Sequence, residues 1–156
     1  MIAVQDNYLT HNEINHFMGL WNENIALFTE PIISFYSIDL MTNDFDISSI
    51  QNNVFDRKYF YKMRLQKYNE SFDQIKDFHG HENINNYIIF LNDNFTGGEL
   101  EFENGLFVKP KKGTLIYFNN NEKHRVRNCV GDRYVFTCLG DIQVDIKWQI
   151  RKKNII

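Results

Sequence analysis

The chain has 156 residues, of which 43% are hydrophobic and 15% aromatic, which is enough for one compact domain but too little for two. Its formal net charge of -3 and its pI near 5.9 argue against nonspecific binding to nucleic acid. We therefore expect a single domain over residues 1–156, with an N-terminal strand and helix in residues 1–31 and a β-barrel core in residues 32–156.

Cysteine content and hydropathy indicate the cellular compartment. The two cysteines, Cys129 and Cys138, lie in a stretch typical of a β-hairpin, so no disulfide framework is expected. Residues 1–9 lack the basic start and apolar run of a signal peptide, and no apolar run is long enough to cross a membrane. We expect a soluble, cytoplasmic protein without membrane contact. Its frequent Asn, Ile, Lys and Phe residues are typical of an AT-rich microbe or a virus.

A first helix is predicted after Thr10. The Thr10 side chain can cap the helix, Glu13 completes a capping box, and Leu9 can pack against Ile14 as a hydrophobic staple. Pro31 marks the end of the helical pattern. The apolar positions that recur at helical spacing, and that we expect to face the core, are Ile14, Phe17, Met18, Trp21, Ile25 and Phe28.

Beyond Pro31 the chain is rich in aromatic and β-branched residues and predicts a mainly β structure, interrupted by a short helical stretch near residues 48–55. Asn104-Gly105 predicts a hairpin of the primed type. The ring-rich residues Phe55 and Tyr59 to Tyr61 are expected to feed the core rather than a substrate face. The predicted strands are 32–38, 59–68, 87–91, 99–102, 106–108, 114–118, 124–129, 133–139 and 142–148. They indicate a double-sheet barrel or jelly roll, with the helix packed outside.

Histidines in this β region predict a metal site. Because residues i and i+2 of a strand face the same way, His79 and His81 can chelate one ion, and His124, at the start of a late strand, can supply a distal ligand. Imidazole ligands favour iron, zinc, copper or nickel over magnesium and calcium. Arg133, on the following strand, offers the fixed fork that a dicarboxylate cosubstrate needs.

Six segments in a fixed order carry a family resemblance over most of the chain. They are Val4 to Thr10 with the following helix, Leu65 to Tyr68, Ile88 to Asp93, Gly97 to Leu100, Lys109 to Phe118, and His124 with Arg133 nine positions later. In this order the residues resemble the iron(II)- and 2-oxoglutarate-dependent oxygenases, specifically the prolyl-4-hydroxylase-like branch.

The resemblance implies a distorted double-stranded β-helix, cupin-like in shape, with iron(II) at one end and 2-oxoglutarate chelating it. Arg133 would bind the far carboxylate of 2-oxoglutarate, and Tyr68 and Thr137 match family positions that line the cosubstrate site. Ascorbate is a further candidate cofactor. In the family, oxygen converts 2-oxoglutarate to succinate and carbon dioxide while a hydroxyl group is added to the substrate. The resemblance therefore implies a hydroxylase acting on a peptidyl substrate, with prolyl among the candidates, or on a small molecule.

One departure concerns the first metal motif, which is His-x-Asp in the family and His79-Gly80-His81 here. The preferred interpretation is a three-histidine site of His79, His81 and His124, because the spacings from Tyr68 to His79 and from His79 to Leu91 fit the family best. In another register His81 is the first ligand and Asn83 replaces the acid, and Glu82 offers a carboxylate if the backbone bulges. An imidazole in place of the carboxylate leaves the site one unit more positive.

A second departure is Phe90, where some relatives have a tyrosine that hydrogen-bonds the far carboxylate of the cosubstrate. The carboxylate would therefore be bound by Arg133 with fewer other donors. Three hypotheses therefore stay open: a 2-oxoglutarate oxygenase, a cupin-like metal-binding protein of another reaction type, and a non-catalytic jelly-roll binding protein that has lost the metal-ligand carboxylate. The sequence identifies neither the substrate nor the oligomeric state. Substrate selectivity is expected in loops such as residues 38–53 and 69–78.

Overall fold

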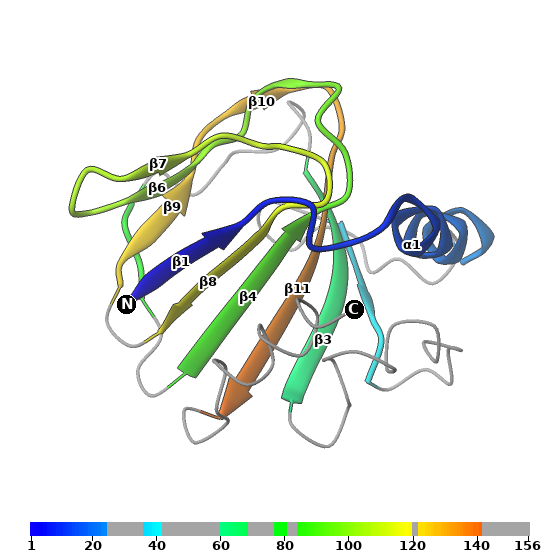
Figure 1. Cartoon of the computed structure of the whole chain (residues 1–156), viewed down its shortest axis with the longest axis horizontal. Helices are drawn as coiled ribbons and strands as arrows, with labels where there is room; N and C mark the ends of the chain where they lie inside the picture. Colours follow the sequence, from blue (N-terminus) through cyan, green and yellow to red (C-terminus); the bar gives the residue numbers. More distant parts are fainter. Residues whose placement is uncertain (25–35, 42–59, 69–76, 81–83, 120–121, 142–156) are drawn as a thin grey trace.

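The computed structural model describes residues 1–24, 36–41, 60–68, 77–80, 84–119 and 122–141. In this part of the chain, antiparallel strands form a large sheet and two small ones, and a helix lies at the side (Figure 1). The elements are β1 (Ile2–Gln5), α1 (His11–Glu23), β2 (Tyr36–Asp39), β3 (Phe60–Tyr68), β4 (Ile84–Phe90), β5 (Thr96–Gly97), β6 (Leu100–Phe102), β7 (Phe107–Val108), β8 (Leu115–Asn119), β9 (His124–Val126), β10 (Cys129–Val130) and β11 (Arg133–Asp141).

Sheet topology joins strands that are far apart in sequence. The described strands of the large sheet follow the order β1-β8-β4-β11-β3-β2, and each neighbouring pair is antiparallel. A second sheet has the order β7-β6-β9, and β10 pairs with β5. The predicted strand over residues 124–129 is thus two strands, because β9 pairs with β6 while β10 pairs with β5. The mainly β double-sheet architecture agrees with the prediction.

Helix α1 begins as predicted. Thr10 Oγ1 accepts a hydrogen bond from the Glu13 backbone N–H at 3.2 Å, and Glu13 Oε2 accepts one from the Thr10 N–H at 2.9 Å. The buried side of the helix packs on the large sheet, where the rings of Phe17 and Phe136 lie 4.5 Å apart. The predicted positions Ile25, Phe28 and Pro31, the stretch 48–55 and the strand 142–148 lie outside the described residues.

The alternation of β11 gives the large sheet two different faces. Phe136 and Cys138 belong to the hydrophobic cluster beneath α1, whereas Val135 belongs to a second cluster that packs against β6 and β7. Both cysteines, Cys129 and Cys138, are buried free thiols within strands. The face opposite the helix, enclosed by the small sheets, is the one on which the candidate site lies.

The turn between β6 and β7 differs from the predicted primed hairpin. Both primed turns with Asn104 and Gly105 as central residues need positive φ at Asn104, but of these two residues only Gly105 has it, at 89°. The Gly105 N–H donates to the Phe102 carbonyl, and the Phe102 N–H donates to the Leu106 carbonyl, both at 2.9 Å. The loop therefore has three residues, with glycine in the left-handed position after an ordinary turn, because Glu103 also leaves the strand.

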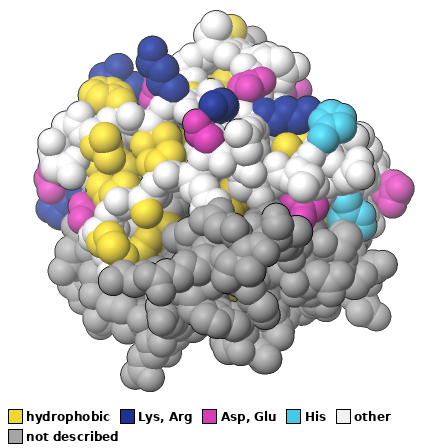
Figure 2. Space-filling model, viewed as in Figure 1, with side chains coloured by type: hydrophobic (Ala, Val, Ile, Leu, Met, Phe, Trp, Pro, Cys, Tyr) yellow, Lys and Arg dark blue, Asp and Glu magenta, His cyan; other side chains and the backbone are white. Residues whose placement is uncertain are grey.

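The exposed hydrophobic side chains of the described part include Val4 in β1 and Leu106 and Phe107 in the β6–β7 hairpin. Figure 2 shows hydrophobic side chains gathered on the left of the view. The Arg127 guanidinium lies 4.6 Å from the centre of the Phe107 ring. Within the described ranges, no helix is long and apolar enough to cross a membrane.

Candidate active site

Two of the predicted metal ligands, His79 and His124, lie side by side. His79 lies between β3 and β4 along the chain. Its backbone pairs with that of His124, at the start of β9, through N–H···O bonds of 3.0 and 2.9 Å. This pairing brings the two rings to a centroid separation of 4.4 Å. Imidazoles 45 positions apart in the chain are thus held at one place by the backbone, as a shared metal site needs.

The environment of the buried His124 orients its ring. Its Nδ1 lies 3.1 Å from the Glu122 carbonyl oxygen, and the Phe118 ring packs on it edge-on at a centroid distance of 4.5 Å. Because a carbonyl oxygen only accepts hydrogen bonds, this contact places the proton on Nδ1. In this tautomer Nε2 carries the lone pair, which is the arrangement that supporting hydrogen bonds impose on metal-binding histidines.

Arg133, the predicted carboxylate clamp, is a buried cation. The residue is only 1% exposed, and its Nε donates to the Gly98 carbonyl at 3.0 Å. The guanidinium lies 4.9 Å from the centre of the Tyr68 ring and 5.1 Å from that of Phe90. Its Nη2 is buried and has no hydrogen-bond partner among the described residues. Burial lowers the Arg133 pKa, yet an arginine stays charged, so this donor is suited to an anion.

Tyr68 stands opposite Arg133 in the pairing of β3 with β11. Burial raises the pKa of the Tyr68 phenol, although the positive charges of Arg133 and Arg64 oppose that rise. The phenol therefore stays neutral near pH 7, and its hydroxyl donates to Gln66 Oε1 at 3.4 Å. The phenol has a single O–H, so it could donate to a carboxylate beside the guanidinium only by turning away from Gln66.

The absence of a side chain at Gly98 leaves room for the side chain of Arg133. It has a φ of 70°, and a Cβ added there would lie 2.9 Å from Arg133 Cδ and 2.9 Å from the Phe95 ring. We expect Gly98→Ala to lower the free energy of unfolding by about 1–3 kcal/mol, measured by urea denaturation. Gly105→Ala is the matched control, since Gly105 also has positive φ but has no atom of the described residues within 4 Å of an added Cβ. Equal losses in the two variants would contradict the crowding at Arg133.

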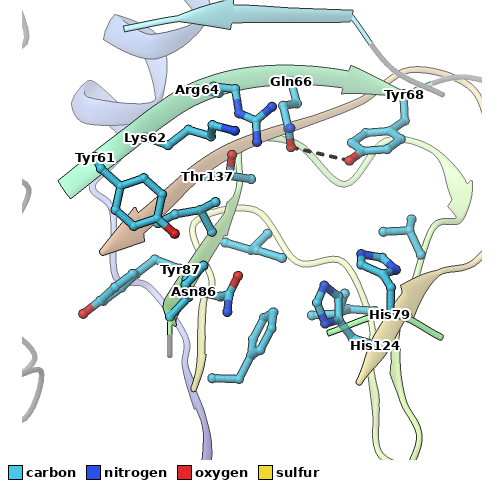
Figure 3. Close-up of a pocket in the computed structure, with 16 residues that line it drawn as sticks. Tyr61, Lys62, Arg64, Gln66, Tyr68, His79, Asn86, Tyr87, His124 and Thr137 are labelled. Atoms are coloured by element: carbon cyan, nitrogen blue, oxygen red, sulfur yellow. Dashed lines mark hydrogen bonds between the residues drawn. The ribbon is translucent and has the colours of Figure 1, made fainter. Parts of the chain in front are cut away.

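A cavity of about 490 Å³ lies between the large sheet and the small sheets, a usual size for a ligand pocket. His79, His124, Tyr68 and Thr137 line it, so four of the predicted site residues meet at one cavity (Figure 3). Arg133 does not itself line the cavity but contacts Tyr68, which does. Apolar lining comes from Ile84, Ile88, Leu100, Phe118, Val126 and Leu139.

Several lining residues were missed by the sequence reasoning. Counting back from Tyr68 in steps of two along β3 reaches Gln66, Arg64 and Lys62, and all three line the cavity. That spacing was the available signal. Tyr61, expected in the core, is instead 52% exposed at the cavity, while its neighbour Phe60 is buried as expected. Asn86 and Tyr87 of β4 complete the polar lining.

The third metal ligand stays a prediction. His81 and both alternatives, Glu82 and Asn83, lie outside the described residues. Within the described ranges, no group of three or more His, Cys, Asp or Glu side chains is placed to hold a metal ion. The part of the site that the structure describes is therefore a pair of imidazoles, to which a ligand from residues 81–83 would be added.

Comparison with known proteins identifies the fold. The model of the family described as the 2OG-Fe(II) oxygenase superfamily matches residues 58–139, which is more than half of the chain. No curated protein matches the sequence significantly.

Solved structures are similar over nearly the whole chain. A Pseudomonas putida prolyl-4-hydroxylase has a TM-score of 0.67 at 14% identity, covering 90% of this chain and 91% of its own. A prolyl 4-hydroxylase from Phytophthora capsici has a TM-score of 0.67 at 19% identity, covering 92% and 60%. HygX from Streptomyces hygroscopicus, solved with nickel, 2-oxoglutarate and hygromycin B, has a TM-score of 0.57 at 10% identity, covering 92% and 83%. At these identities the likeness concerns the fold, and it confirms the double-stranded β-helix.

Proposed function

This chain belongs to the 2OG-Fe(II) oxygenase superfamily, and from that premise we propose that it is an iron(II)- and 2-oxoglutarate-dependent dioxygenase that hydroxylates a peptidyl or small-molecule substrate. The observation that carries the proposal is a single cavity lined by the paired imidazoles of His79 and His124 and by Tyr68, whose ring contacts the buried guanidinium of Arg133. The family explains why both features occur together, because its reaction needs a metal and a dicarboxylate.

The described residues fit both groups. His79 and His124 would hold the iron, with His81 as the proposed third ligand. Arg133 Nη2, buried without a partner in the described part, would bind the far carboxylate of 2-oxoglutarate, and Tyr68 and Thr137 would line its path. The iron and 2-oxoglutarate, when bound, supply the oxygen activation that hydroxylation requires.

The chain's own side chains would control the environment of that chemistry. The hydrogen bond from His124 Nδ1 to the Glu122 carbonyl would orient the ring so that Nε2 is the nitrogen offered to a metal. The contact of Arg133 Nε with the Gly98 carbonyl fixes the direction of the guanidinium, and Phe118 and Leu100 add apolar surface to the cavity. The burial of Arg133 would strengthen its attraction to a carboxylate, because charges interact more strongly away from water.

The substrate belongs to one of two classes. Two solved neighbours are prolyl 4-hydroxylases, and another holds hygromycin B, so both peptides and small molecules are candidates. The test incubates iron-loaded protein with 2-oxoglutarate, oxygen, and either proline-containing peptides or free amino acids, followed by mass spectrometry. We expect one class to gain an oxygen atom with an equal amount of succinate formed.

Titrations of the protein with the metal and with 2-oxoglutarate distinguish the alternatives. Metal binding without 2-oxoglutarate binding would favour a cupin-like protein of another reaction type. Absence of both would favour a non-catalytic jelly-roll binding protein.

A further inference from the structure

The two faces of β9 carry different kinds of side chain. His124 lines the cavity beside His79, as Figure 3 shows. The next residue, Arg125, does not line the cavity, and its side chain points to the opposite face because side chains alternate along a strand. A candidate metal ligand and an arginine are thus neighbours in the chain but lie on opposite sides of the same strand.

The arginine contacts the segment that carries the other candidate ligand. The bridge between His79 and His124 places Phe78 opposite Arg125, because the partners in an antiparallel pairing advance in opposite directions along the two chains. The Arg125 guanidinium lies 4.3 Å from the centre of the Phe78 ring, within the range of a cation–π contact. The segment 77–80 is therefore joined to β9 by two backbone hydrogen bonds and by a side-chain contact on the face away from the cavity.

Glu101 holds the guanidinium from the other side of β9. It is buried and stands opposite Arg125 in the pairing of β6 with β9, and its Oε2 accepts a hydrogen bond from Arg125 Nε at 2.7 Å. This hydrogen bond raises the pKa of Arg125 despite partial desolvation, and the charges of Glu101 and Asp77 add to the rise. Arg125 therefore lies as a cation between an acid of β6 and the segment 77–80.

We propose that Arg125 is a positioning residue for the metal site. Its contact with Phe78 keeps the His79 imidazole beside that of His124, and its hydrogen bond with Glu101 keeps the guanidinium in place for that contact. The inference rests on the proposed function, in which the two histidines bind the iron. Because Arg125 does not line the cavity, it would act on the metal through His79.

The sign of the effect separates positioning from simple electrostatics. A guanidinium near a metal ligand repels a divalent cation, so electrostatics alone predicts that removing the charge of Arg125 tightens metal binding. Positioning predicts the opposite, because a displaced His79 ring is a poorer ligand. Weaker metal binding by a folded protein that has lost a positive charge is therefore the result that positioning requires.

The test titrates the metal-free full chain with manganese(II) in competition with a metal indicator, after circular dichroism has shown that each variant is folded. We expect Arg125→Met to weaken manganese(II) binding by about tenfold, the lower end of the range for losing a group that supports a metal ligand. Arg125→Lys keeps the charge but not the flat guanidinium that stacks on a ring, so it should recover only part of the affinity.

Changes at Phe78 test the same contact from its other partner. Phe78→Leu should also weaken manganese(II) binding by about tenfold, whereas Phe78→Tyr, which keeps a ring, should retain the affinity. The double variant with Arg125→Met should bind little more weakly than either single variant, because both changes remove the same contact.

The matched control is Arg127→Met. Arg127 Nε also pairs with Glu101 Oε2, at 3.1 Å, but its guanidinium lies over a different ring, 4.6 Å from the centre of Phe107. The control therefore removes the same charge and an ion pair with the same acid, but not the contact with Phe78. It should keep the manganese(II) affinity or tighten it slightly.

The outcomes separate this inference from the proposed function. Unchanged or tighter manganese(II) binding in Arg125→Met and Phe78→Leu, even with a lower free energy of unfolding, would overturn the inference and leave the proposed function standing. Losses that multiply in the double variant, or an equal loss in Arg127→Met, would also overturn it. If Arg125→Met does not fold, Phe78→Leu decides alone. An unmodified chain that binds no manganese(II) would overturn the proposed function and the inference together.

Discussion

Replacing Arg133 by methionine is expected to lower the affinity for 2-oxoglutarate by roughly 100-fold or more, while leaving the fold intact. The loss follows because the variant removes the buried donor that is proposed to bind the far carboxylate. Stability should not fall with it, because burial removes the hydration of the guanidinium and the contacts with Gly98, Tyr68 and Phe90 offset only part of that cost. Exchange of a buried charge for an apolar side chain of similar volume is often neutral or stabilising, by up to about 4 kcal/mol.

Two measurements separate the roles of Arg133. Calorimetric titration of the manganese-loaded protein with 2-oxoglutarate gives the affinity, and urea denaturation gives the free energy of unfolding. Arg127→Met is the control, because Arg127 is half-exposed, does not line the cavity, and forms an ion pair with Glu101 at 3.1 Å. An Arg133→Met protein that unfolds far more readily but still binds 2-oxoglutarate would show that the arginine is structural.

The second large effect is expected from the histidine pair. His79→Ala and His124→Ala should each weaken binding of iron(II) or manganese(II) by more than about 100-fold, which is the upper range for losing only a supporting hydrogen bond. The reason is that each variant removes a proposed ligand from a site held together by the backbone pairing of these two residues. Competition titration against a metal indicator gives the affinity. His11→Ala, in the exposed first turn of α1, should have no effect.

Variants at the third position distinguish the open ligand assignments. The three-histidine interpretation predicts that His81→Ala loses metal affinity as His124→Ala does, whereas Glu82→Ala and Asn83→Ala keep it. His81→Asp recreates the His-x-Asp pattern of the family and should bind iron(II) at least as tightly as the unmodified chain, because it adds an anionic oxygen ligand. Unchanged affinity in His81→Ala would move the third ligand elsewhere.

The fold was largely predictable because its signals are local and periodic. The capping box of Thr10 and Glu13 depends only on two residues three positions apart. The strands are predicted from the alternation of apolar and polar side chains along each segment. The β6–β7 turn was predicted wrongly because Asn104-Gly105 does not reveal that Glu103 leaves the strand as well. Likewise, the division of residues 124–129 into two strands depends on which strand each half pairs with, and pairing between distant segments is not encoded in local spacing.

The order and spacing of the motifs along the chain allowed us to predict which residues of the candidate site come together. His79, His124, Tyr68 and Thr137 meet at one cavity, as the family resemblance implied. Arg64 was missed because an arginine in a strand is usually explained by an acid on the neighbouring strand, and only the position of the cavity shows that it faces inward. The sequence also could not reveal that Arg133 would be fully enclosed, with one donor left unpaired within the described part.

The most direct test of the account is an anaerobic titration of the metal-free protein with iron(II) and 2-oxoglutarate, followed by visible absorption. The account predicts a charge-transfer band that requires both components, because iron held by the histidines must be chelated by 2-oxoglutarate anchored at Arg133. The band should be lost in His81→Ala and in Arg133→Ala. A protein that binds iron(II) tightly but shows no band with 2-oxoglutarate would contradict the assignment of this cavity as an oxygenase site.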